Sequence, residues 1–421
     1  MKRLPLNFYR IQMAYLMFAS VAASFSLFLV WSFTSTGLSS AYLGLVLGLA
    51  SLAGFLKFIF LSFFGIHSHE RILGSGLCVM AIAVVSLPFT FTSGGIFSLA
   101  IAAIWLSICG AFVKTASVAV IPQTSPQEHA ATAFSHRGAM FSFEPLMGPM
   151  LAGAVISLFG GDGYLANAIV FLIVVLALFA RSDFGANTTN PENPAEKQYG
   201  LNGFTLLWGV KTELWIAVIS ALFNFAFNPF LILIMPLVVI EKLNLGPFHV
   251  GVLDGAFAAG IFVGSSYLVS LANSIIGARF SIFVGGVAIS LAIMSVAVIE
   301  DYYFLLAVQS LAGVGLALFN VNVTKIRCMA TPILYRTKLE SSFMLTCMST
   351  IPVGMWFFGI LASNGAWSVS LATSGGCLLL ASLLVLAVPY LDSLAKMTSE
   401  TLDGAYARVY PKLFSVKQFK N

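Results

Sequence analysis

Long apolar runs recur along the whole chain, and short polar stretches separate them. Each run is about 20 residues long, and a helix that rises 1.5 Å per residue needs about that length to cross roughly 30 Å of hydrocarbon. Strands of a membrane barrel would be shorter, at about ten residues each. The pattern therefore predicts an all-α membrane protein with twelve transmembrane helices. They are expected near residues 11–33, 41–64, 72–91, 96–120, 138–158, 163–180, 214–240, 250–272, 280–299, 302–323, 339–363 and 367–390.

Positive charge is distributed unevenly between the loops that join these spans. With the N-terminus inside, nearly every loop Lys and Arg lies on the inner side, and Lys242 is the exception in an outer loop. Short loops rich in Lys and Arg are retained in the cytoplasm, so both termini are predicted to be cytoplasmic. The first apolar run continues to about Phe33, beyond the core of a cleavable signal peptide, and we expect it to be the first span.

The composition agrees with this class. The chain is 59% hydrophobic and 9% charged, with a mean hydropathy of +0.96, which excludes a soluble domain. Its net charge of +5 is spread over loops expected to face anionic lipid, so we predict membrane lipid as a partner and no nucleic acid. The five cysteines lack paired spacing and are expected to pack as thiols rather than form disulfides or a metal site.

One polar segment, NTTNPENPAEKQYG, is rich in Asn, Pro and charge, which is typical of a linker. It follows the sixth span and divides the twelve equally. The predicted organisation is a six-helix half over residues 1–181, a cytoplasmic linker over residues 182–212, a second six-helix half over residues 213–390 and a cytoplasmic tail over residues 391–421.

The two halves show a weak internal repeat. AYLGLVLGLASLAG from Ala41 resembles FHVGVLDGAFAAG from Phe248, and EPLMGPMLAG from Glu144 resembles IPVGMWFFG from Ile351 at nearly the same offset. Glycines at these spacings allow membrane helices to approach closely. Repeated halves are expected of secondary transporters, and the alternative is chance similarity between glycine-rich helices.

Twelve spans, a central linker and repeated halves resemble the plan of the major facilitator superfamily of secondary transporters, over essentially the whole chain. The closer resemblance is to its drug- and siderophore-exporter branch, and in particular to bacterial enterobactin-exporter-like proteins. It rests on the GPxxAG from Gly148, on Arg336 before the eleventh span and on the PVGxxxxG from Pro352. The resemblance implies an integral multi-pass protein of the bacterial inner membrane that moves its substrate by alternating access.

Within its first half, the chain departs from the family pattern at two places. In the loop after the second span, GIHSHERILG from Gly65 stands where the family has GxLaDRxGR, with Glu70 and Arg71 one position late for the acid and the base. In the fifth span, the antiporter pattern would place a glycine at the position of Glu144.

The resemblance also implies a central cavity lined mainly by spans one, four, seven and ten. Spans two, five, eight and eleven then form the surfaces on which the two halves rock. The residues expected to act in this gating are Gly148, Pro149, Gly153, Pro352, Gly354 and Gly359, together with Glu70 and Arg71.

Several polar residues on the cavity spans are candidates for substrate binding. Asn224 and Asn228 are four residues apart and share one helix face, beside Phe227. The alternative is that each Asn bonds to a neighbouring helix, an interaction that averages about 0.6 kcal/mol in membranes. Asn320 and Asn322 point to roughly opposite sides, so at most one of them can face the cavity. The last candidate in this set is Trp105, although tryptophan in such spans often simply packs.

Charged side chains inside the spans are few, and each costs roughly 2.5–3.5 kcal/mol on insertion scales. Glu144 in the fifth span and Asp254 in the eighth lie toward opposite membrane faces, which suits proton exchange during transport. The alternative for each acid is a static interhelical hydrogen bond or, for Glu144, an ion pair with Lys114. Lys57 and Lys114 lie near span ends, where a lysine can extend its ammonium group to the interface.

Other activities lack their motifs. There is no GxxxxGK[ST] for an ATP-driven pump and no GxSxG for hydrolysis, and nothing completes a metal site around His67 and His69. We therefore expect a monomeric, cofactor-free secondary transporter that exports a siderophore or drug-like amphipathic compound in exchange for protons. Proton-coupled uptake of a polar nutrient and a membrane enzyme or scaffold are the alternatives.

Overall fold

The computed structural model describes residues 5–64, 95–119, 130–181, 203–332, 335–363 and 365–414. Within these ranges, nothing is described of the side chains of residues 53–64, 96, 111–119, 130–146, 337 and 399. Every regular element in the described ranges is helical, which confirms the predicted all-α class. Helices are the form expected in lipid, because each segment satisfies its own backbone hydrogen bonds.

Helices coincide with eleven of the predicted spans, and the remaining one, at residues 72–91, lies outside the described residues. Seven helical stretches of the described chain are long and apolar enough to cross a membrane. The helices that coincide with the predicted spans are α1 (Leu6–Ser35), α2 (Ser40–Phe64), α4 (Gly95–Ala119), α6 (Ala130–Ala180), α9 (Lys211–Pro229), η2 (Phe230–Ile234), α10 (Met235–Leu237), η3 (Val238–Lys242), α11 (Pro247–Val263), η4 (Gly264–Leu268), α12 (Val269–Val296), α13 (Tyr302–Ala330), α14 (Arg336–Met348), α15 (Ile351–Ser363) and α16 (Trp367–Val385).

Two glycines divide long helical stretches into successive spans. Gly160 in α6 has φ 68° and Gly277 in α12 has φ 78°, a region that favours glycine because it has no Cβ. Gly160 falls between the predicted fifth and sixth spans, and Gly277 falls between the eighth and ninth. Each glycine therefore allows a sharp turn with almost no loop.

The seventh span is not a regular α-helix. It runs through α9, η2, α10 and η3, and the η segments are π-helical. Pro229 and Pro236 lie within it, and proline has no N–H to donate to the preceding turn. Single π-helical turns are often found at functional sites, so this interruption draws attention to the surroundings of the two prolines.

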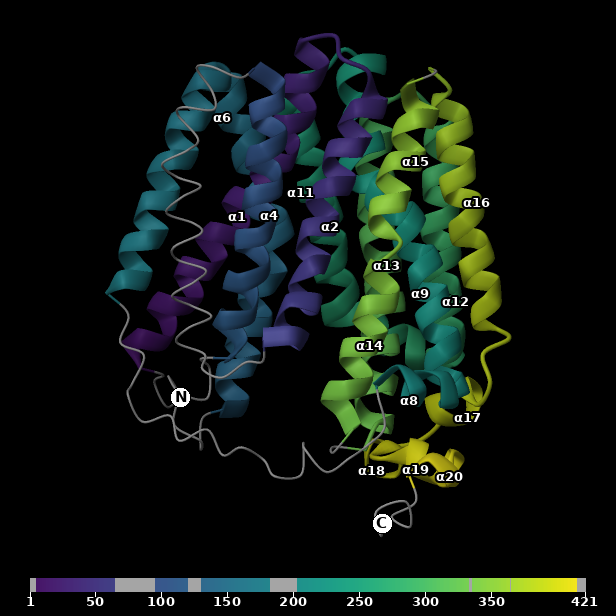
Figure 1. Ribbon diagram of the computed structural model, residues 1–421. Coiled ribbons are helices and arrows are strands. Elements are labelled where there is room, and N and C mark those ends of the chain that lie inside the picture. The colour runs from purple at the N-terminus through teal and green to yellow at the C-terminus, as the bar shows by residue number, and fades with distance from the viewer. Residues whose placement is uncertain are drawn as a thin grey trace. The chain divides into compact units, whose positions relative to one another are not determined.

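The chain forms two compact units. The first unit comprises Met1–Thr188, Asn228–Ala258 and Pro352–Ser370, and in it α1 packs along α6 and α2 packs along α4 (Figure 1). The second unit comprises Thr189–Phe227, Ala259–Ile351 and Leu371–Asn421, and in it α12 packs along α13. These units group segments by packing, whereas the predicted halves group them by chain order, so the division at residues 182–212 stays a prediction.

Short helices gather at one end of the second unit. They are α8 (Gly203–Gly209), α17 (Leu391–Ala395), α18 (Ser399–Leu402), α19 (Ala405–Val409) and α20 (Pro411–Phe414), and Figure 1 shows α17 to α20 close to α8. Leu391, Leu394 and Tyr406 are buried there. The part of the predicted tail that the structure describes is therefore folded against the helices of its own unit.

Candidate functional site

A cavity of about 410 Å³ lies within the first unit. Its volume is in the range of small-molecule pockets, roughly 300–1,000 Å³. We call it the main cavity, and its wall is drawn from α1, α6, α9, η2, α10 and α11. The lining residues are Ala23, Ser26, Leu27, Pro149, Asn228, Leu231, Ile232, Pro236, Asp254 and Phe257.

Two residues that the sequence assigned to different roles lie together on this wall. Asp254 was expected to exchange protons and Asn228 to bind substrate, and both line the main cavity. Among the described lining residues, Asp254 is the one with an ionisable side chain. It forms no hydrogen bond or ion pair with any other residue whose side chain the structure describes. Its carboxylate is therefore available to a ligand or a proton.

A second cavity of about 210 Å³ adjoins the main cavity and shares Ser26 and Ile232 with it. Its wall comes from α1, α2, α4, η2 and α15. Its polar side chains are serines, and Ser51 and Ser107 donate hydrogen bonds to the carbonyl oxygens of Leu47 and Ala50. The described wall of this second cavity is therefore apolar or neutral, and the ionisable side chain, Asp254, belongs to the main cavity.

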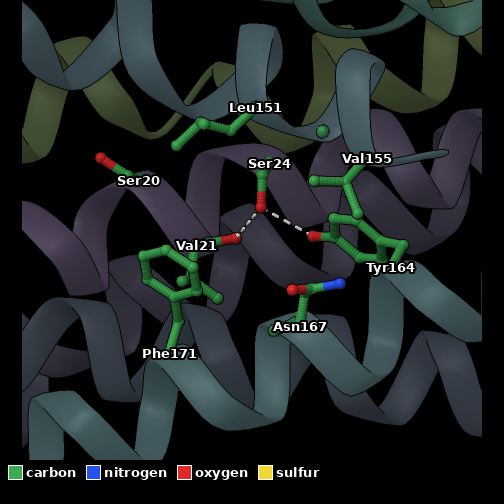
Figure 2. A pocket seen from close by; sticks show the side chains of 10 residues that line it. Ser20, Val21, Ser24, Leu151, Val155, Tyr164, Asn167 and Phe171 are labelled. Atoms are coloured by element: carbon green, nitrogen blue, oxygen red, sulfur yellow. Dashed lines mark hydrogen bonds between the residues drawn. The ribbon is translucent and has the colours of Figure 1, made fainter. Parts of the chain in front are cut away.

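A smaller pocket of about 60 Å³ lies between α1 and α6 (Figure 2). Figure 2 shows Ser24 between the carbonyl oxygen of Val21, at 2.8 Å, and the hydroxyl of Tyr164, at 2.7 Å. Because the Ser24 hydroxyl donates to Val21, the Tyr164 hydroxyl donates to Ser24. Asn167 donates to the carbonyl oxygen of Gly163 at 2.8 Å. The pocket is too small for a drug-sized molecule, and the hydrogen bond between Tyr164 and Ser24 joins α6 to α1.

Spans two and eleven meet at glycines within the first unit. A Cβ atom on Gly44 of α2 would lie 2.5 Å from the carbonyl oxygen of Met355 and 2.8 Å from the Cα of Gly359 in α15. A Cβ atom on Gly48 would lie 3.0 Å from the carbonyl oxygen of Pro352. Real Cβ atoms do not approach backbone atoms so closely, so only glycine at position 44 allows this contact.

The internal repeat relates span five to span eleven and span eight to span two. Spans five and eight make a contact that matches the one between spans two and eleven. A Cβ atom on Gly153 of α6 would lie 2.6 Å from the carbonyl oxygen of Pro247, and one on Gly251 of α11 would lie 2.8 Å from that of Pro149. Gly148 instead faces α1, where its Cβ would lie 2.6 Å from the Cβ of Ala23. The fifth span is therefore close-packed on two sides.

The remaining predicted gating residue of span eleven, Gly354, is buried in α15. Four of the predicted gating residues lie at the two interhelical contacts, namely Pro149, Gly153, Pro352 and Gly359. Their part in gating stays a prediction, because close packing alone does not reveal motion.

Two of the other predicted substrate-binding residues, Asn224 and Asn322, form hydrogen bonds between helices. Asn224 donates from Nδ2 to the carbonyl oxygen of Cys347 at 3.1 Å. Asn322 is buried, accepts from Asn273 at 2.7 Å and donates to the carbonyl oxygen of Leu318. These bonds join α9 to α14 and α12 to α13, as in the alternative of an interhelical hydrogen bond. Neither residue lines a cavity described above.

The last three candidates in this group are Phe227, Trp105 and Asn320. Phe227 is buried with its ring centroid 5.1 Å from that of Phe223. Trp105 is half-buried in α4, and Asn320 is exposed on α13. None of the three lines the cavities described above, so their roles stay predictions.

Five predicted residues cannot be placed at side-chain level. Glu144, Lys57 and Lys114 lie on α6, α2 and α4, and their side chains are outside the described residues. Glu70 and Arg71 lie outside the described residues altogether. The predicted proton exchange at Glu144 and its pairing with Lys114 therefore stay predictions.

Ser26, Pro236 and Phe257 are among the residues of the main cavity that were not singled out from the sequence. Pro236 carried a signal, because two prolines seven residues apart in one span mark an irregular helix. Ser26 and Phe257 carried none, since serine and phenylalanine recur in most of the predicted spans. Their importance appears only when separate helices are brought together.

A model of the Major Facilitator Superfamily matches residues 13–237, which is more than half of the 421 residues. The chain belongs to this superfamily. It is accordingly a transporter rather than an enzyme, and an integral multi-pass membrane protein that handles a small-molecule substrate in lipid. The resemblance noted from the sequence is thereby confirmed at the level of the superfamily.

Solved transporter structures match this superfamily member over most of its length. A bacterial metal transporter is 16% identical over 92% of this chain and 99% of that one, with a TM-score of 0.66. A D-xylose–proton symporter is 13% identical over 90% and 97%, with a TM-score of 0.68. A POT family transporter in complex with 5-aminolevulinic acid is 10% identical over 93% and 97%, with a TM-score of 0.71. At these identities the likeness shows the fold alone. No curated protein sequence matches the chain.

Proposed function

We propose that this transporter exports a small amphipathic compound, a siderophore or a drug-like molecule, in exchange for protons. The main cavity is the proposed binding compartment. The observation that carries the proposal is the composition of its wall, which combines apolar side chains with the carboxylate of Asp254, the amide of Asn228 and the hydroxyl of Ser26. Apolar walls with a few polar groups suit a ligand that is partly apolar and must be oriented.

Protons are the proposed coupling ion. Ionisable residues inside a membrane often belong to proton relays, and this chain has Asp254 on the cavity wall and Glu144 on α6. The solved D-xylose–proton symporter supports the idea that this fold can couple to protons. Asp254 and Glu144 are thus the two residues whose neutralisation should uncouple transport.

The two glycine contacts are the proposed moving surfaces. Contacts between backbones, such as those of Gly44 with Gly359 and of Gly153 with Pro247, involve few interlocked side chains. Small shifts between helices at such places need little repacking. The proposal includes the enterobactin-exporter-like branch, a monomer, the bacterial inner membrane and both termini in the cytoplasm.

The test uses purified protein in proteoliposomes with an imposed pH gradient. The probes are tryptamine as a drug-like amphipath, 2,3-dihydroxybenzoate as a fragment of a catecholate siderophore and D-xylose as a polar nutrient. We expect an aromatic probe to move opposite to the proton flow, and Glu144→Gln or Asp254→Asn to abolish its dependence on the gradient. The compound should emerge unmodified, as transport requires.

Other outcomes separate the alternatives. Movement of D-xylose in the same direction as protons would indicate nutrient uptake by symport. Probe movement that ignores the pH gradient in the unmodified protein would overturn proton coupling, and a chemically altered product would indicate an enzyme.

A further inference from the structure

The main cavity presents several oxygen acceptors and one negative charge. The carboxylate of Asp254 has no partner among the residues whose side chains are described, and the wall holds no cationic side chain within the described residues. Ser26 donates its own proton to the carbonyl oxygen of Ala23 at 2.7 Å, so its oxygen can only accept from a ligand. The amide oxygen of Asn228 adds a further acceptor on the same wall.

The broken seventh span adds a backbone acceptor. Pro236 cannot donate to the carbonyl oxygen one turn earlier, which belongs to Ile232 in α-helical geometry or to Leu231 in π-helical geometry. Both residues line the main cavity. Carbonyl oxygens at interrupted membrane helices are known to bind cations in transporters.

When Asp254 is ionised, its carboxylate on this largely apolar wall favours a ligand of opposite charge. A neutral ligand would then leave the charge unpaired, and an anionic ligand would be repelled by it. A metal dication would need a denser set of ligands, and no group of three or more His, Cys, Asp or Glu that could hold one occurs within the described residues. An organic cation satisfies the carboxylate and also fills the apolar space beside Leu231 and Phe257.

We propose that the main cavity recognises the protonated primary amine of an aromatic or aliphatic compound. The three N–H bonds of the ammonium group are received by Asp254, Asn228 and either Ser26 or a backbone carbonyl oxygen of Leu231 or Ile232, and the apolar body lies against Leu231 and Phe257. The inference rests on the proposed function and narrows its substrate from amphipathic compounds in general to primary amines.

Four probes with one indole body test the inference on the purified full-length protein in detergent. Tryptamine carries a primary ammonium group, N,N,N-trimethyltryptammonium the same charge without N–H donors, tryptophol no charge and indole-3-acetate a negative charge. Binding is measured by calorimetry. We expect tryptamine to bind roughly tenfold or more tightly than each of the other three.

Variants locate the recognition. Asp254→Asn should remove the preference for tryptamine over tryptophol while tryptophol binding is unchanged, and Asp403→Asn in the exposed tail serves as the matched control. Should Asp254→Asn fail to fold, competition on the unmodified protein gives the answer, because tryptamine should displace a bound fluorescent amine and indole-3-acetate should not.

The inference is overturned if tryptamine does not bind at millimolar concentration, if any other probe binds as tightly, or if folded Asp254→Asn keeps the preference. These results are separate from those for the proposed function. Export of 2,3-dihydroxybenzoate against protons without amine preference would leave the function standing and defeat the inference. Amine-selective binding without transport would support the inference and contradict the proposed function.

Discussion

The guanidinium Nε of Arg327 in α13 lies 2.9 Å from Oε2 of Glu213 in α9, and neither side chain is more than 4% exposed. The pair does not stand alone. Nη2 of Arg327 lies 2.8 Å from Oε2 of Glu340 in α14, and the hydroxyl of Tyr406 in α19 donates to Oε1 of Glu213 at 3.0 Å. One cluster, buried at Glu213, Arg327 and Tyr406, thus joins three membrane helices of the second unit to its C-terminal short helices.

Replacing Arg327 with Met should destabilise the protein strongly. The change removes the cation and leaves the carboxylate of Glu213 buried without its counter-charge, which typically costs roughly 3–5 kcal/mol. Thermal unfolding of the purified protein in detergent should show a clearly lower Tm. The matched control is Lys396→Met, whose partner Asp392 lies 2.6 Å away in an exposed pair of small worth. Equal Tm losses in the two variants would contradict the assigned importance of the buried cluster.

Tyr406→Phe tests the link between the tail and α9. The variant deletes one hydroxyl and leaves an oxygen of Glu213 without its donor, for a loss of about 1–3 kcal/mol. The control is Tyr390→Phe, since Tyr390 is 56% exposed and belongs to no buried cluster described above. A Tm of Tyr406→Phe no lower than that of the control would argue against a stabilising bond.

The stabilisation contributed by the Tyr406 hydroxyl should depend on pH. Burial, and then the negative charge of Glu213, raise the pKa of the Tyr406 hydroxyl well above its ordinary value of 10.0. Because the pKa is higher in the folded than in the unfolded state, the stabilisation is complete below pH 10.0 and is lost as pH rises toward the folded-state pKa. The Tm difference between the unmodified protein and Tyr406→Phe should therefore be constant near neutral pH and shrink above pH 10.0. A difference that grows with pH would contradict this sign.

The fold was largely predictable because its determinants are local. A span is recognised by its own length and apolarity, and Gly160 falls in the gap expected between the fifth and sixth spans. The main departure is the seventh span. Its two prolines indicate an irregular helix, but its π-helical geometry depends on packing against neighbouring helices.

The candidate site was predictable only in part. Asp254 and Asn228 stood out as polar residues in apolar spans, but their position on one cavity wall depends on how separate helices come together in the fold. The Arg327 cluster was not foreseen, because Arg327 is 114 residues from Glu213, and Tyr406 is 193 residues from Glu213. No periodic pattern connects residues at such distances, and charges near the ends of spans are ordinarily taken as interfacial.

Gly44→Ala should harm both stability and transport. The added methyl group would meet the backbone of α15 at 2.5 Å, and overpacking of this kind costs typically about 1–3 kcal/mol. Gly376→Ala in α16 is the matched control, because its Cβ would meet nothing within 4 Å and alanine favours helix by up to about 1 kcal/mol. We expect a lower Tm and slower probe exchange for Gly44→Ala and a Tm at or above that of the unmodified protein for Gly376→Ala. Normal exchange in Gly44→Ala would remove support for a moving contact there.

Asn228→Ala should weaken substrate binding. Its side chain lines the main cavity, so the truncation removes a ligand contact of the proposed site. A hydrogen bond to a charged ligand is worth about 1.5–3 kcal/mol, which corresponds to roughly a tenfold or greater rise in the KM for tryptamine exchange. Ser290→Ala provides the comparison, because the Ser290 hydroxyl donates to the carbonyl oxygen of Gly375 at 2.6 Å inside the second unit. That variant should lower the Tm and leave the KM unchanged. The opposite pattern, with the KM altered by Ser290→Ala and not by Asn228→Ala, would place the substrate outside the main cavity.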